Sequence, residues 1–325
     1  MTDYRFSTAP IEHPHHRHGW WWKTLLGGFA LWVLTIVVTA ATGNANLVPT
    51  LILLGSFLVP FCVVLFVAER VVGSVSALQV ILAFFVGGIF GVLGASLLES
   101  NLKQSVGMYV AVGFIEEFVK AVVLVFVARR VVPKTPGQGA LLGATVGAGF
   151  AAFESAGYAF NAAITTQGID LISLLHTEVL RAILAPVGHV LWTAILGAVI
   201  FGAARNERLR LTGRVIVAFV GVALLHALWD SLGGITSTIA LIFTGNALQQ
   251  LQYGFLSPRT QAAVSSLATV LYIVGVIVTA VLGIVALLVV LRHRRGTAQP
   301  QAPVPAEVSW PPPAGPRSGS STSPR

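Results

Sequence analysis

The chain has 325 residues, of which 55% are hydrophobic and only 10% are charged, and its formal net charge is +8. Soluble domains carry roughly 25% charged residues, so this composition predicts an integral membrane protein. The positive charge does not indicate a nucleic-acid partner, because no basic stripe with interleaved aromatic residues occurs. The single cysteine, Cys62, lies in an apolar run and excludes both a disulfide framework and a cysteine-based zinc site.

Transmembrane helices need about 20 mostly apolar residues. The first apolar stretch is too long for a signal-peptide core and lacks a small-residue cleavage site, so we expect a retained anchor. We predict an all-α fold, a polytopic membrane helix bundle over 24–292, between a disordered tail at 1–23 and a disordered Pro/Ser-rich tail at 293–325. About eight stretches qualify as spans: 24–42, 47–68, 75–98, 106–128, 139–164, 182–204, 213–234 and 262–291.

The positive residues predict the orientation of this bundle. With eight spans, 16 Lys and Arg residues lie on the side of the termini, and three lie on the other side, Lys103, Arg181 and Arg259. Lys and Arg accumulate in cytoplasmic segments, so we predict that both termini are cytoplasmic. The expected location is the plasma membrane, as a multi-pass protein in contact with lipid.

Two glycine stripes predict close helix packing. Gly87 and Gly91 lie four residues apart in the third span, and Gly139, Gly143 and Gly147 share one face of the fifth. Such stripes let helix backbones approach closely, so we expect the fifth helix at the centre of the bundle.

The ionisable residues at membrane depth fall in four consecutive spans, the fourth to the seventh. Each charge near the bilayer centre costs about 2.5–3.5 kcal/mol, so a bundle retains such a set only if it is compensated. Counting about 1.5 Å per residue from the cytoplasmic boundaries gives similar depths, between about 18 and 24 Å, in antiparallel helices. The sequence therefore predicts one polar layer, formed by Glu116, Glu117, Lys120, Glu154, His189, His226 and Asp230.

The charge balance of this layer indicates a cation. Four carboxylates and one lysine give a net charge of −3 if all are ionised, which a dry site does not tolerate, and a divalent metal would leave −1. A catalytic zinc ion typically takes three protein ligands, and Glu154, His189 and His226 form a two-His, one-Glu set. Glu116 or Glu117 would then act as general base.

Spacing also places supporting groups beside these residues. Asp230 follows His226 by four residues, on the same helix face, where it can orient the imidazole. Lys120 stands in the same relation to Glu116. Residues 165–181 mix apolar and polar side chains, and we expect an interfacial helix there at the mouth of the site.

Four short motifs resemble those of PrsW-like proteases, relatives of the CAAX-type membrane proteases. The run 116–120 resembles their Glu-Glu-x-x-Lys motif and 150–154 their Phe-x-x-x-Glu motif. The segment 181–189 is similar to the one with their third conserved group, and 226–230 to their last His-x-x-Trp motif. The resemblance covers about 50–235. Ser155 and Asp230 stand where Asn is commoner, and both keep hydrogen-bonding capacity.

The resemblance implies a metal-dependent intramembrane endopeptidase, of a kind typical of bacteria. It implies peptide-bond hydrolysis within or near the membrane, in regulated intramembrane proteolysis, with single-span membrane proteins such as anti-sigma factors as substrates. Motifs of other intramembrane proteases are absent: there is no His-Glu-x-x-His, no Gly-x-Ser-Gly and no Gly-x-Gly-Asp.

Two other classes of function remain open from the residues alone. A proton- or ion-coupled transporter would also place Glu, Lys and His at the membrane midplane, although no inverted repeat with broken helices is evident. A non-enzymatic scaffold would leave the buried carboxylates unexplained.

Overall fold

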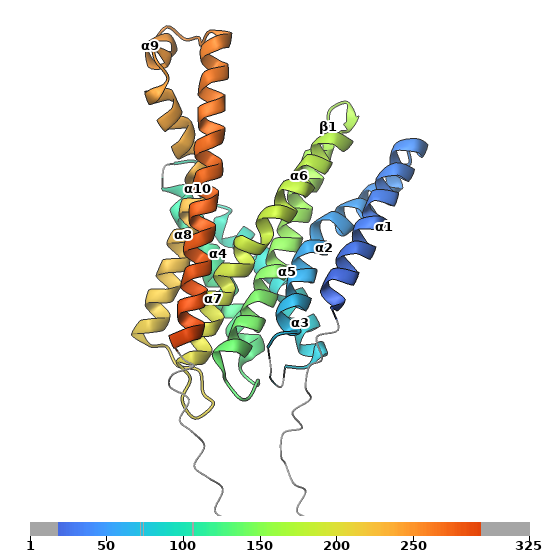
Figure 1. Cartoon of the computed structure of the whole chain (residues 1–325), viewed down its shortest axis with the longest axis vertical. Coiled ribbons are helices and arrows are strands. Elements are labelled where there is room, and N and C mark those ends of the chain that lie inside the picture. The colour runs from blue at the N-terminus through green and yellow to red at the C-terminus, as the bar shows by residue number, and fades with distance from the viewer. Residues whose placement is uncertain (1–18, 72, 74, 106, 294–325) are drawn as a thin grey trace, which may run out of the picture.

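The computed structural model describes residues 19–71, 73, 75–105 and 107–293, and the chain there is almost entirely helical (Figure 1). Most of the two predicted tails, residues 1–18 and 294–325, lies outside the described residues. The predicted N-terminal tail is too long by four residues, because α1 already begins at Trp20. The elements in chain order are α1 (Trp20–Thr42), η1 (Ala45–Leu47), α2 (Val48–Ala68), α3 (Ala77–Glu99), α4 (Met108–Ala128), α5 (Pro136–Ala163), β1 (Ile164–Thr165), β2 (Gly168–Ile169), α6 (Leu171–Leu184), η2 (Ala185–Val187), α7 (His189–Gly202), α8 (Gly213–Phe243), α9 (Ala247–Gln252) and α10 (Pro258–His293).

The all-α membrane bundle that the sequence predicts is confirmed. Seven helical stretches of the described chain are long and apolar enough to cross a membrane, and they include every predicted span except the fourth. That span is α4, which has 21 residues but carries Glu116, Glu117 and Lys120. The beginning of α1 and the end of α10 lie at the same end of the bundle (Figure 1). A chain that crosses the membrane an even number of times has both termini on the same side, so this arrangement is consistent with eight spans. The number of spans and the cytoplasmic location of the termini stay predictions.

The sixth predicted span differs most from its expected form. Instead of one helix over 182–204, the chain forms α6, the 3₁₀ turn η2 and α7. Pro186 has no N–H to donate and Gly188 has a non-helical backbone, so the helix is interrupted immediately before His189. Residues 165–181, expected as an interfacial helix, form most of the short β1–β2 hairpin and of α6, and α6 packs against α2 and α5. Because α6 belongs to the stretch Leu171–Gly202 that is long and apolar enough to cross a membrane, its interfacial position is not supported.

Helix α6 has a well-defined start. Asp170 caps it by accepting hydrogen bonds from the Ser173 backbone N–H at 3.0 Å and from the Ser173 hydroxyl at 2.6 Å. These bonds hold the pKa of the Asp170 carboxyl below its usual value.

The central position of α5 is confirmed by its packing. A methyl group at Gly139, Gly143 or Gly147 would overlap backbone carbonyl oxygens of α7, at Gly197, Thr193 and His189 respectively. The α3 stripe works in the same way, since a methyl group at Gly87 would overlap the backbone of α5. These glycines let α5 contact α7 and α3 through the backbone itself.

At the opposite end of the bundle from the beginning of α1, α8 and α10 form an extended arm that carries α9 (Figure 1). The two helices have 31 and 36 residues, longer than the predicted spans 213–234 and 262–291. At 1.5 Å per residue they measure about 46 and 54 Å, whereas the hydrocarbon core of a bilayer is about 30 Å thick. Both helices therefore extend beyond the spans that hydropathy predicts.

Candidate active site

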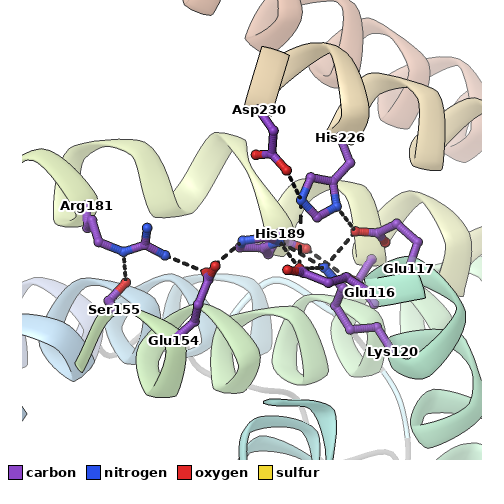
Figure 2. A network of polar contacts seen from close by, with 10 residues as sticks. Glu116, Glu117, Lys120, Glu154, Ser155, Arg181, His189, His226 and Asp230 are labelled. Carbon is purple, nitrogen blue, oxygen red and sulfur yellow. Dashed lines mark hydrogen bonds and ion pairs between the residues drawn. The ribbon is translucent and has the colours of Figure 1, made fainter. Parts of the chain in front are cut away.

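The polar residues of α4, α5, α7 and α8 meet in one cluster, and α6 adds a fifth contributor (Figure 2). Lys120 lies at its centre with a fully buried side chain. Its ammonium lies 2.7 Å from Glu117 Oε1 and 3.4 Å from Glu116 Oε2. It also lies 2.9 Å from His189 Nδ1. These contacts join α4 to α7 through one buried cation.

His226 is held on both sides of its ring. Its Nδ1 lies 3.0 Å from Glu117 Oε1, and its Nε2 lies 3.3 Å from Asp230 Oδ2, one turn along α8. The contact with Asp230 has the geometry that the i+4 spacing predicts. The imidazole also packs against the Trp192 ring, with centroids 4.7 Å apart. The ring therefore has a fixed orientation.

His189 is oriented from the opposite side of the cluster. Its Nε2 lies 3.0 Å from Glu154 Oε2, and the same oxygen accepts a hydrogen bond from Arg181 Nη2. Arg181 Nε donates a second bond to Ser155 Oγ at 2.8 Å, and the guanidinium stacks over Tyr158 at 4.3 Å. Glu154 is thus held between a cation of α6 and the imidazole of α7.

The ring nitrogens that face Glu116 also have other partners in the cluster, because His226 Nε2 contacts Asp230 and His189 Nδ1 contacts Lys120. Glu116 Oε2 lies 3.7 Å from His226 Nε2 and 3.9 Å from His189 Nδ1. Two ligands of one zinc ion, each about 2.0–2.2 Å from it, lie at most about 4.4 Å apart. Ligand atoms of all three residues lie within 4.8 Å of one another, so these side chains would have to move slightly closer to share one ion. The other nitrogens face Glu117 and Glu154, the carboxylate–histidine pairing typical of metal sites.

The donor chemistry and the charge of the site fit a divalent cation. Glutamate oxygen and neutral imidazole nitrogen are both suitable zinc ligands. The cluster contains four carboxylates and two fixed cations, Lys120 and Arg181, which gives −2 if the carboxylates are ionised. A divalent cation would neutralise this charge.

A cavity of about 380 Å³ reaches the cluster. Glu116, Glu154, His189 and Asp230 line it, and Arg181 is its only basic residue among the described ones. Glu117 and Lys120 do not line it, since both are fully buried behind Glu116. A molecule in the cavity thus meets Glu116 but not Glu117.

All seven residues of the predicted layer lie in this cluster, but their roles stay predictions. The geometry favours Glu116 over Glu154 as the partner of the two histidines, because Glu154 is occupied by Arg181. From the sequence, Arg181 was only a loop charge and the start of the third motif, so its contact with Glu154 was not predicted. The available signal was its place in an amphipathic segment, eleven residues after the helix-capping Asp170.

Comparison with known proteins agrees with the motifs. No curated protein and no solved structure matches the chain. A family model described as PrsW family intramembrane metalloprotease matches residues 20–256, well over half of the chain. The match contains all four motifs and every residue of the cluster, so the chain is a membrane protease that belongs to the PrsW family of intramembrane metalloproteases.

Proposed function

We propose that the chain is a metal-dependent intramembrane endopeptidase that cleaves single-span membrane proteins. Glu116, His189 and His226 would hold a divalent cation, which we take to be zinc. The observation that carries this proposal is the grouping of their ligand atoms within 4.8 Å, beside a cavity that Glu116 and His189 line. Other carboxylates orient both histidines, which a loose collection of polar residues would not require.

In this proposal Glu116 is the carboxylate that accepts a proton from the attacking water. Its contacts described above all run through Oε2, so Oε1 is the oxygen that remains for the proton. A bound divalent cation supplies Lewis-acid chemistry for peptide hydrolysis. Glu117 and Glu154 fix the two imidazoles, and Asp230 holds His226 from the cavity side. Lys120 balances the buried carboxylates and does not touch the substrate.

The substrate class follows from the place and size of the cavity. A volume of about 380 Å³ accommodates a few side chains and not a whole helix. We therefore propose that a substrate enters as a locally unwound segment of a membrane-anchored protein. Anti-sigma factors with one transmembrane helix are a substrate type that the family resemblance suggests.

The test combines metal analysis with cleavage by the purified protein. We expect about one zinc ion per wild-type chain and loss of metal in His189→Ala and His226→Ala. His176→Ala is the matched control, since His176 is an exposed histidine of α6. A reconstituted single-span substrate should be cut by wild type and control, and Glu116→Gln should slow cleavage by about 10²–10⁴-fold. Full cleavage by Glu116→Gln would remove this residue from the chemistry.

A transporter built on the same residues is not favoured by the family match, which describes a protease. It predicts ion-coupled flux into proteoliposomes that depends on Glu116 and His226, with no peptide bond cut. Flux without cleavage in the same preparations would favour it over the protease.

A further inference from the structure

A further buried carboxylate lies outside the cluster, at the junction of three helices. Glu178 of α6 is only 2% exposed. Its Oε2 accepts a hydrogen bond from the indole Nε1–H of Trp32, on α1, at 2.8 Å. Its Oε1 has no hydrogen-bond partner among the described residues. Burial of a carboxyl group with so little compensation is costly, so the contact needs a reason.

The α2 backbone leaves room for this carboxyl group. A methyl group on Gly55 would overlap the carboxyl carbon and both oxygens of Glu178. The carboxyl end of Glu178 is therefore enclosed by the indole of α1 and the bare backbone of α2. This arrangement fastens one side of α6 to two helices that contribute nothing to the catalytic cluster.

The next turn of α6 carries the contact with the site, on a face next to that of Glu178. Arg181 follows Glu178 by three residues, within one helical turn, and binds Glu154 and Ser155 of α5. Glu154 in turn contacts His189. Just after this turn the helix is interrupted at η2. Because α6 and α7 are not one continuous helix, α7 does not fix the position of α6.

From these contacts we propose that Glu178 is a positioning residue for proteolysis. By fixing α6 against Trp32 and Gly55, it sets Arg181 on Glu154 and thereby the orientation of His189. Helix α1, most of whose side chains are exposed, then belongs to the functional unit through Trp32. The expected effects on kcat rest on the proposed function, whereas the expected effect on the position of α6 does not.

Kinetics with single variants test the positioning. Glu178→Ala should lower kcat/KM between about tenfold and 100-fold, mainly through kcat, as misplacement of a catalytic group by about 1 Å does. Glu178→Gln keeps an acceptor for the indole and should stay within about threefold of wild type. Trp32→Phe should lower kcat, whereas Trp22→Phe, on an exposed part of α1, should not.

Two double variants show whether Glu178 affects kcat through its contact with Gly55 and through Arg181. Gly55→Ala should impair the wild type but be harmless in Glu178→Ala, where the overlapping carboxyl is gone. Its control is Gly27→Ala, at a position with open space. In an Arg181→Gln background, Glu178→Ala should add no further loss. An equal loss in both backgrounds would overturn the route through Arg181, and full activity of Glu178→Ala would overturn the proposal.

A spectroscopic measurement separates this inference from the protease assignment. Spin labels at the exposed positions Ile172 of α6 and Leu97 of α3, with the buried Cys62 changed to Ala, report the position of α6 without any substrate. We expect Glu178→Ala to shift or broaden the distance distribution, and Glu178→Gln to leave it unchanged. An unchanged distribution in Glu178→Ala would contradict the proposal even if the chain proved to be an active protease.

Discussion

Lys120→Met should lower the free energy of unfolding by more than the loss of one hydrogen bond would, because Lys120 makes several buried contacts. The ammonium is fully buried, and it contacts Glu117, Glu116 and His189 within 3.4 Å. Methionine fills nearly the same space but leaves two buried carboxylates without their cation. Removal of one partner of a buried ion pair costs about 3–5 kcal/mol, because the remaining charge is uncompensated.

The measurement is equilibrium unfolding in detergent micelles, followed by circular dichroism. Lys103→Met, at an exposed loop lysine, is the matched control and should change stability by less than about 1 kcal/mol. Lys120→Met combined with Glu117→Gln removes both charges of the closest pair and should recover at least half of the loss. If Lys120→Met costs no more than the control, or if the double variant is less stable than Lys120→Met alone, the charge compensation described here is wrong.

Three further predictions concern other parts of the molecule. Gly143→Ala should destabilise the bundle by about 1–3 kcal/mol in the same unfolding assay, while Gly157→Ala, at an open position, should not. Arg181→Gln should lower kcat at least tenfold, because Glu154 loses its hydrogen bond to Arg181. The zinc content should not change, because Glu154 is not one of the proposed metal ligands; loss of zinc would instead make Glu154 part of the metal site. Reporter fusions at Gly168 and Gly296 should report opposite sides of the membrane, and the same side for both would contradict eight crossings.

Much of the site could be predicted because the order of the helices and the depth of each polar residue along its helix can be counted from the sequence. Apolar runs gave the helices, and residue counts from their ends placed Glu116, Glu154, His189 and His226 in one layer. The i+4 spacing also gave the contact of His226 with Asp230. These are properties of single helices, so one sequence is enough to find them.

What the sequence could not give is the rotation of each helix and the contacts between helices. Hydropathy placed Arg181 outside the membrane, but the interruption at η2 lets α6 lie against α5 and turn this side chain towards Glu154. Glu178 was not recognised for the same reason. The choice between Glu116 and Glu154 as partner of the histidines depends on ångström distances that residue counts do not resolve.

The backbone contact between α5 and α7 has a consequence for how this chain can evolve. Gly147 lies against the His189 carbonyl, so peptide groups, and not side chains, set the spacing between the helices that carry Glu154 and His189. Any larger residue along this contact must be accompanied by a second change in the opposite helix, and intermediates with one change are penalised. We therefore expect sequence drift to concentrate in the helices outside this contact, where a change of substrate preference leaves the catalytic spacing intact.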